Sequence, residues 1–128
     1  MPLHPYFQST PIWQRDLPAA LAEAQATDRR VFLLVARADC GGSRTLVEKT
    51  IAKEESYEYL VERFVCVARD ADELTAEERA LVARMRLSER TPFCLYLDGA
   101  GKLAFESAGG RPAAVFLNDL MEGATRRV

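Results

Sequence analysis

The sequence has little of several features that mark large classes of proteins. Its 128 residues include one histidine and three cysteines, and 17 Lys and Arg are balanced by 19 Asp and Glu. A net charge of −2 with Arg interleaved among Glu and Asp does not favour nucleic-acid binding, because phosphate recognition needs clustered positive charge. The few cysteines and the single histidine supply neither a disulfide framework nor a zinc site. We therefore expect no metal site and no bound cofactor.

Long apolar runs are also missing. The longest, residues 31–36, is far too short to cross a bilayer, and the N-terminal Met-Pro-Leu-His-Pro lacks the basic and apolar regions of a secretory leader. We expect a cytoplasmic protein without membrane contact. A chain of this length buries roughly two-thirds of its unfolded surface, so one domain can be stable without cross-links. Residues 1–15, with three of the six prolines, are assigned to an N-terminal arm that packs Trp13 onto the domain of residues 16–128.

Apolar runs predict the strands. Residues 31–36, 64–68 and 93–97 are rich in strand-forming residues and apolar on both faces, which is typical of strands covered on both sides. Residues 98–101, Asp-Gly-Ala-Gly, have the chemistry of a hairpin turn. Residues 102–106 alternate polar and apolar side chains, as a half-exposed antiparallel strand does. A mixed sheet of about four strands is predicted.

Helical patterns lie between these strands. Asp16 is expected to cap a helix that ends near Thr27, and Ser56 to start a short helix. Thr75 and Glu78 have the spacing of a capping box. A last helix is expected after Pro112, with an apolar stripe of Phe116, Leu117, Leu120, Met121 and Ala124. Strands that alternate with helices predict an α/β layered fold.

The segment Cys40-Gly41-Gly42-Ser43 lies between a buried strand and a predicted helix start. Free amides and the helix dipole stabilise a thiolate at such a position, so we expect a lowered pKa for Cys40. Gly41 and Gly42 let the loop turn tightly and leave the sulfur open. The cysteine equally suits an ordinary loop, and Ser43 equally suits a plain helix cap.

Charged neighbours act on Cys40 in both directions. Arg37 and Arg44 would favour a thiolate there, whereas Asp39 would oppose it.

The pair Thr91-Pro92 stands immediately before the third apolar run. Proline cannot donate to a sheet, so its place at the head of a central strand needs a reason, and a cis peptide bond would supply one.

Taken in order, these motifs resemble a thioredoxin-like domain. The resemblance rests on the strand at 31–36, the Cys40-Gly41-Gly42-Ser43 segment, residues 60–67, Thr91-Pro92 and residues 98–102, and it covers roughly residues 13–124. It is closest to stand-alone bacterial proteins similar to the spermatogenesis-associated thioredoxin-like group. It implies a three-layer α/β fold with a central mixed sheet flanked by helices.

The resemblance also implies roles for single residues. Cys40 matches the nucleophilic cysteine, and Pro92 matches the cis-proline that faces it. Thr91 matches the residue whose backbone pairs with a bound peptide, and the two glycines after Cys40 line the same groove. Ser43 stands where the family has its second, resolving cysteine.

Two further positions depart from the family pattern. Leu34 replaces a buried acid, and Asp39 replaces the aromatic residue before the nucleophile. An ordinary dithiol reductase is therefore not expected. One hypothesis is a monothiol protein in which Cys40 forms mixed disulfides with protein thiols or a small thiol such as glutathione. The alternative is a non-catalytic binding module that keeps the fold and the peptide groove.

The other two cysteines lie within predicted strands. Cys66 is expected to be an inert core residue, because free cysteine packs like a small hydrophobe. Cys94, two residues after Pro92, is also expected in the core, although a place beneath Cys40 would make it an unconventional resolving thiol. In a thioredoxin-like sheet the two strands flank the strand at 31–36, about 10 Å apart, which excludes a disulfide between Cys66 and Cys94.

Overall fold

The computed structural model describes residues 13–14, 16–37, 51, 54–83, 92–108 and 113–127. Its elements in chain order are β1 (Trp13–Gln14), α1 (Leu17–Thr27), β2 (Arg30–Ala36), α3 (Glu54–Arg63), β3 (Phe64–Asp70), α4 (Ala76–Ala83), β4 (Phe93–Leu97), β5 (Leu103–Ala108) and α5 (Ala113–Thr125). Helices and strands alternate up to β4, and β5 then follows β4 directly, as the sequence predicts.

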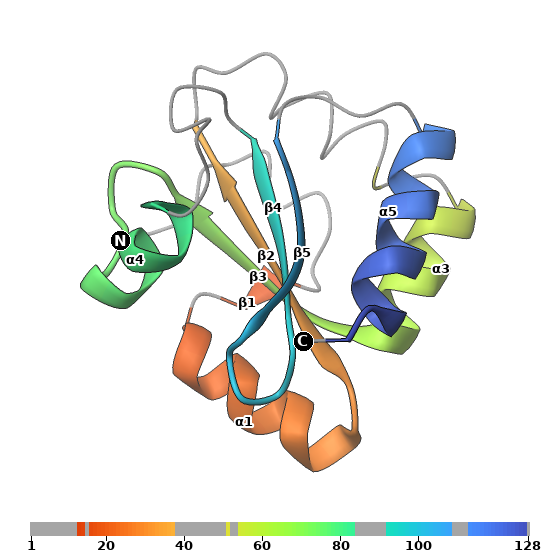
Figure 1. Ribbon diagram of the computed structural model, residues 1–128, viewed down its shortest axis with the longest axis horizontal. Helices are drawn as coiled ribbons and strands as arrows, with labels where there is room; N and C mark the ends of the chain where they lie inside the picture. The colour runs from red at the N-terminus through yellow and green to blue at the C-terminus, as the bar shows by residue number, and fades with distance from the viewer. Residues whose placement is uncertain are drawn as a thin grey trace.

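The strands in the described part of the chain form one mixed sheet in the order β1-β3-β2-β4-β5 (Figure 1). β2 pairs in parallel with β3 and antiparallel with β4, and all its residues from Val31 to Ala36 are buried. The predicted mixed sheet is confirmed. The additional strand is β1, in which Trp13 pairs opposite Cys66 and its ring lies 6.0 Å from that of Phe32. Trp13 thus packs on the domain as expected.

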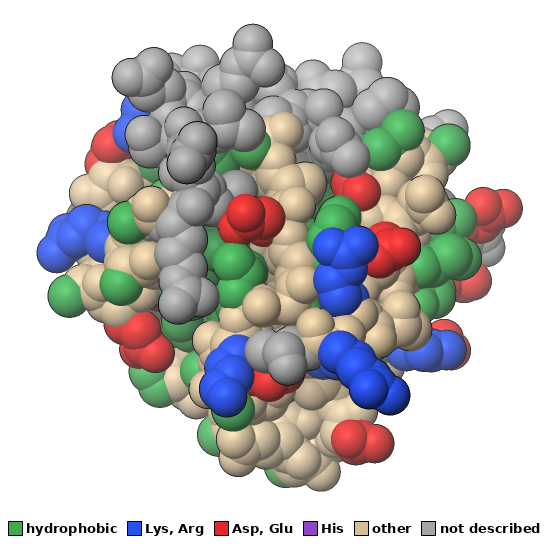
Figure 2. Space-filling view, in the orientation of Figure 1, with side chains coloured by type: hydrophobic (Ala, Val, Ile, Leu, Met, Phe, Trp, Pro, Cys, Tyr) green, Lys and Arg blue, Asp and Glu red, His purple; other side chains and the backbone are tan. Residues whose placement is uncertain are grey.

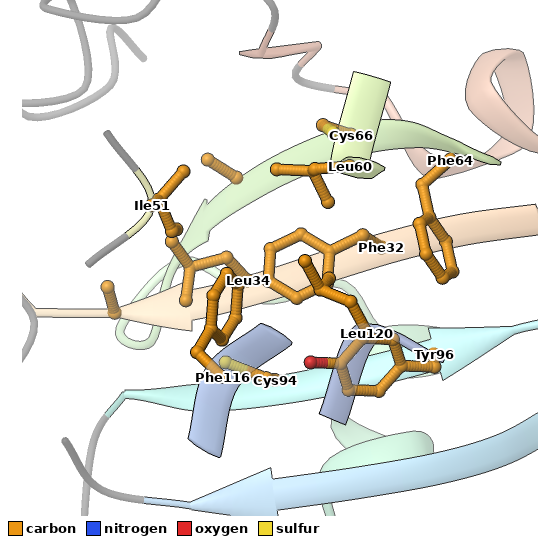
Figure 3. Close-up of a cluster of buried hydrophobic side chains, with 12 residues drawn as sticks. Phe32, Leu34, Ile51, Leu60, Phe64, Cys66, Cys94, Tyr96, Phe116 and Leu120 are labelled. Carbon is orange, nitrogen blue, oxygen red and sulfur yellow. The ribbon is translucent and has the colours of Figure 1, made fainter. Parts of the chain in front are cut away.

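Side chains alternate along the strands between two hydrophobic layers, with α3 and α5 on one face of the sheet and α1 and α4 on the other (Figure 1). The α3/α5 cluster consists of Phe32, Leu34, Ala36, Ile51, Leu60, Phe64, Cys66, Ala68, Cys94, Tyr96, Phe116 and Leu120 (Figure 3). The α1/α4 cluster consists of Leu17, Ala20, Ala24, Val31, Leu33, Val35, Val65, Val67, Val82, Phe93, Leu95 and Leu97. This three-layer arrangement is the predicted fold class.

Short-range polar contacts fix the ends of two helices. The Asp16 carboxylate accepts a hydrogen bond from the Ala19 amide at 3.2 Å, and Asp28 ends α1 in the left-handed region at φ 54°. At the start of α4 the Thr75 hydroxyl accepts from the Glu78 amide at 3.2 Å, and the Glu78 carboxylate accepts from the Thr75 amide at 2.9 Å. Both predicted caps are confirmed.

The predicted hairpin is also confirmed. The Asp98 carboxylate accepts from the amides of Ala100 and Lys102, both at 2.9 Å. Gly101 adopts φ 87°, a left-handed conformation that glycine reaches without strain. The turn brings β5 back beside β4, so the sheet gains its antiparallel edge.

Two details of the helix predictions are wrong. The helix α3 begins at Glu54, before Ser56, and the Ser56 side chain is only 2% exposed, so it is not an end cap. On α5 Phe116 and Leu120 are buried, but Met121 is 44% exposed. Successive helix residues are about 100° apart, and the buried face of α5 includes Gly123. Met121 lies outside that face, although the pattern of apolar residues places it inside.

Two consecutive arginines connect the start of β2 to the ends of the helices on the α3/α5 face. Arg29 Nη1 donates to the carbonyls of Val61 and Phe64, at 3.2 and 3.3 Å. Arg30 Nη1 donates to the carbonyls of Gly123 and Arg126, at 3.0 and 2.7 Å. Cationic donors suit these places, because the last carbonyls of a helix lack partners within it.

None of the helices described is long and apolar enough to span a bilayer.

Candidate functional site

The predicted site comprises Cys40, Gly41, Gly42, Ser43, Thr91 and Pro92. Only Pro92 lies within the described residues, where it is buried directly before β4. The roles of the Cys40-Gly41-Gly42-Ser43 segment, and a cis bond between Thr91 and Pro92, therefore stay predictions.

The sheet brings Pro92 to the end from which the segment with Cys40 departs. β2 ends at Ala36, four residues before Cys40 in the chain. β4 runs antiparallel to β2 and begins with Phe93 opposite Val35. This register places Pro92 beside Ala36, at the carboxyl end of β2.

The turn that follows β3 lies next to this end of β2. An ion pair and two hydrogen bonds stabilise it there. The guanidinium of Arg37 lies 3.4 Å from the carboxylate of Asp72. The Ala71 amide donates to the Ala36 carbonyl at 2.9 Å, and the Asp72 amide donates to the Asp70 carboxylate at 2.8 Å. The turn and the end of β2 therefore form one connected unit.

This ion pair places the negative charge of Asp72 beside the Arg37 charge that the sequence analysis expects to act on Cys40. Cys40 is three positions after Arg37, so their Cα atoms are at most about 11 Å apart, close to one Debye length. The sequence analysis identified Arg37 as a cation that would favour a thiolate. It did not identify Asp72, which belongs to a distant segment of the chain and has no local pattern that points to Arg37.

A second arginine at this end has its charge compensated. Arg69 Nε lies 3.0 Å from the carboxylate of Glu78, which is 2% exposed, and Arg69 Nη2 donates to the Glu73 carbonyl at 2.6 Å. Arg69 therefore supports the start of α4. The face drawn in Figure 2 likewise shows basic and acidic side chains interspersed.

Two of the three thiols lie in the core. Cys66 is 3% exposed and Cys94 is 0% exposed, neither forms a disulfide, and both belong to the α3/α5 cluster. Burial raises the pKa of the Cys66 thiol far above its usual value, and the nearby Arg29 guanidinium opposes this only in part. Their strands flank β2 on opposite sides, about 10 Å apart, so the two thiols cannot pair, as predicted.

A cavity of about 560 Å³ lies at the other end of the sheet, away from Pro92. Arg29, Arg30, Glu62, Arg63 and Asp98 line it together with smaller side chains. Charges of both signs meet there, and two of the arginines already bind helix-end carbonyls. Within the described residues, no three His, Cys, Asp or Glu side chains gather as a metal site.

Comparison with protein families agrees with this arrangement. The family profile described as thioredoxin-like matches residues 12–99. The chain belongs to the thioredoxin-like family. Among curated proteins no match is found.

Solved structures share the thioredoxin-like fold. A thioredoxin from Thermus thermophilus is 28% identical, with 84% of this chain and 83% of that chain covered and a TM-score of 0.67. A proposed disulphide isomerase from Bacteroides thetaiotaomicron is 19% identical, with 91% and 94% covered and a TM-score of 0.73. The oxidised C-terminal domain of DsbD from Neisseria meningitidis is 22% identical, with 88% and 99% covered and a TM-score of 0.63. The last two are similar in fold alone.

In this thioredoxin-like chain Leu34 is buried within β2, at the position where the resemblance implies an acid. Its partners in the sheet are Ala68 of β3 and Cys94 of β4. A carboxyl group there would have to be buried among apolar side chains, which raises its pKa and suits it to proton transfer. Leucine has no ionisable group, so this position carries no acid-base function.

Proposed function

We propose that this thioredoxin-like protein takes part in thiol-disulfide exchange with Cys40 as its single nucleophilic thiol. The observation that carries the proposal is the burial of Cys66 and Cys94, which leaves Cys40 as the remaining candidate. The position of Pro92 beside the end of β2 supports it, because the family's proline faces the nucleophile. Membership of the thioredoxin-like family supports the same chemistry.

The proposed reaction begins when Cys40 loses its proton to solvent. The thiolate attacks one sulfur of a disulfide, a new S–S bond forms, and the other sulfur leaves as a thiolate. The substrates are protein disulfides and thiols or a small thiol such as glutathione. Thr91 would pair with the backbone of a bound peptide, and Gly41 and Gly42 would let that backbone approach.

Ser43 has a different role from the cysteine it replaces. Its hydroxyl can cap the helix that is expected to follow and can donate a hydrogen bond to the Cys40 thiolate, but it cannot form a disulfide. The product of the first step is therefore a mixed disulfide that persists until another thiol attacks it.

A second candidate function is a binding module without redox chemistry. The observation that favours it is Leu34, a buried leucine where catalysis by the family relies on an acid. In that case Cys40→Ser would leave the capture of peptide partners unchanged. In the exchange reaction the same substitution abolishes covalent capture.

Intact-mass spectrometry with oxidised glutathione tests the proposal. We expect the wild-type chain to gain one glutathione, mapped to Cys40, and Cys40→Ser to gain none. The matched variants Cys66→Ala and Cys94→Ala should gain it as the wild type does. Uptake by Cys40→Ser at the wild-type rate, or no uptake by the wild type, would overturn the exchange function.

A further inference from the structure

We propose that the cavity at the end of the sheet away from Pro92 binds a small zwitterion, namely a free amino acid or a short peptide with both an ammonium and a carboxylate. Arg30 binds the carboxylate and Asp98 binds the ammonium. The cavity has a volume of about 560 Å³, and sites for small molecules typically have about 300–1,000 Å³. Cys40 has no part in this binding, because its segment departs from the opposite end of the sheet.

The charged side chains that line the cavity are balanced in sign. Three arginines and three acidic residues line it: Asp28, Arg29, Arg30, Glu62, Arg63 and Asp98. A simple anion would meet the three carboxylates there, and a simple cation would meet the three guanidinium groups. A molecule with one charge of each sign and no net charge complements this lining better than either ion.

Arg30 and Asp98 are neighbours on two adjacent segments of the sheet. The antiparallel register of β2 and β4 runs as far as Val31 opposite Leu97, so Arg30 and Asp98 are the next residues on each side. In the described part of the chain, each of these two side chains bonds to other groups and not to its neighbour. Two opposite charges therefore stand close together at the cavity without neutralising each other.

Two carbonyls hold the Arg30 guanidinium by one of its nitrogen atoms. Nη1 donates to the carbonyls of Gly123 and Arg126, at 3.0 and 2.7 Å, which uses both of its hydrogen atoms. Among the residues that the structure describes, Nε and Nη2 have no acceptor. These two nitrogen atoms form an edge that donates two parallel hydrogen bonds to one carboxylate. Arg30 is thus held in place with a carboxylate-binding edge available.

The β4–β5 turn holds the Asp98 carboxylate in a similar way. Oδ1 accepts from the amides of Ala100 and Lys102, and Oδ2 has no donor among the described residues. The turn is tied to α1, because Gln25 Nε2 donates to the Gly99 carbonyl at 2.7 Å. Oδ2 can accept from an ammonium while Oδ1 keeps its two amides, and such preorganisation favours binding.

Small residues from three elements also line the cavity. They are Ala24 of α1, Gly99 of the β4–β5 turn and Ala124 of α5. Figure 1 shows this turn and the C-terminal ends of both helices at the same end of the sheet. Alanine and glycine offer little apolar surface to a ligand. We therefore expect binding to depend on the two charged ends of the ligand more than on its side chains.

An NMR titration of the ¹⁵N-labelled full chain tests the proposal, with glycine, diglycine and triglycine as probes. We expect saturable shifts of the Arg30 Nε–H signal and of the amides of Gly99, Ala100 and Lys102. The amide of Phe93, at the other end of β4, should not shift. The probe that binds most tightly shows whether the ligand is a free amino acid or a peptide.

Two blocked forms of diglycine separate the two charges. N-acetyl-diglycine lacks the ammonium, and diglycine amide lacks the carboxylate. Each should bind at least about tenfold more weakly than diglycine, because each loses one hydrogen-bonded charge.

Two variants test the residues. Asp98→Asn keeps the oxygen that accepts from the two turn amides and loses the negative charge. Arg30→Lys keeps a cation for the helix-end carbonyls and loses the edge of two nitrogen atoms. Each should weaken diglycine binding at least about tenfold. Glu77→Gln removes an exposed charge on α4, and this control should bind as the wild type does.

Three results would overturn the proposal. The first is the absence of saturable shifts in the wild type with all three probes. The second is equal binding of diglycine and either blocked form, because the cavity would then recognise one charge alone. The third is undiminished binding by Asp98→Asn, which keeps the turn intact and decides the assignment even if Arg30→Lys does not fold.

Discussion

Leu34 of β2 and Cys94 of β4 are direct partners in the antiparallel register, and both side chains are fully buried. The pair lies two residues below Ala36, at the end of the sheet from which the segment with Cys40 departs. A leucine fills the position where the family resemblance implies an acid, and the nearer of the two other thiols is part of the core. Cys40 would therefore act without an internal acid or resolving thiol.

Thiol counting tests this burial. We expect one thiol to react with an aromatic disulfide reagent in the native protein and all three after unfolding, because a protonated, covered thiol is a poor nucleophile. Cys40→Ser should show no fast-reacting thiol in the native state and two after unfolding. A second native thiol that reacts as fast as the first would contradict the buried positions of Cys66 and Cys94.

Gly123 of α5 is expected to tolerate no side chain. A methyl group at this position would overlap the ring of Tyr96, which is itself fully buried. Alanine favours a helix over glycine by about 1 kcal/mol, but overpacking a core typically costs about 1–3 kcal/mol. We expect Gly123→Ala to lower the free energy of unfolding by at least about 1 kcal/mol in urea titrations.

The matched control is Gly99→Ala in the β4–β5 turn. Its new methyl group would lie 3.0 Å from Cγ of Gln25, the flexible part of an exposed side chain that can move. The free energy of unfolding should change by less than about 0.5 kcal/mol. Equal losses for the two variants would show that the contact with Tyr96 is not the cause.

Glu78 combines a helix cap with a buried ion pair. Its carboxylate accepts from the Thr75 amide and lies 3.0 Å from Arg69 Nε. We expect Glu78→Ala to lower the free energy of unfolding by about 2–3 kcal/mol, because it removes both the cap and the buried ion pair with Arg69. Glu78→Gln keeps the cap and should lose about half as much.

Glu77→Ala, an exposed change in the same turn, is the control for helix propensity and should change the free energy of unfolding by less than about 0.5 kcal/mol. A loss for Glu78→Ala no larger than that for Glu77→Ala would mean that the buried pair contributes nothing.

Features set by neighbouring residues could be predicted from the sequence. Asp16 and the pair Thr75 and Glu78 cap their helices through contacts within three residues, and the apolar run of β2 indicates a central strand wherever its partners lie. The strand β1 was missed because two residues carry no pattern, and its partner strand lies far along the chain. Met121 was placed wrongly because the buried face of α5 includes Gly123, and glycine is not an apolar residue that a stripe pattern would identify.

The candidate site was predicted by motif order rather than by geometry. The register places Pro92 at the end of the sheet where β2 ends, since β4 begins opposite the last residues of β2; the roles of the site residues stay predictions. The Arg37–Asp72 pair could not be predicted, because it joins two loops through tertiary structure alone.

That pair should influence the reactivity of Cys40. Asp72→Asn removes a negative charge beside Arg37, which favours the thiolate and should lower the pKa of Cys40. Removing the positive charge in Arg37→Gln should raise it. Because the Cα atoms of Arg37 and Cys40 are at most about 11 Å apart, each shift should be about 0.3–1 pH units, measured as the midpoint of alkylation rate against pH.

Glu62→Gln removes a carboxylate at the other end of the sheet and is the control for a change in net charge. Its midpoint should equal that of the wild type. If Asp72→Asn and Glu62→Gln move the midpoint by the same amount, the effect belongs to net charge and not to the pair with Arg37.

The most direct test of Cys40 as an activated nucleophile is the pH dependence of its alkylation by iodoacetamide in the wild-type chain. A helix-start thiolate predicts a midpoint clearly below the free-thiol value of about 8.5, with the modified residue mapped to Cys40. A midpoint at or above about 8.5 would contradict the claim and favour a binding module in its place.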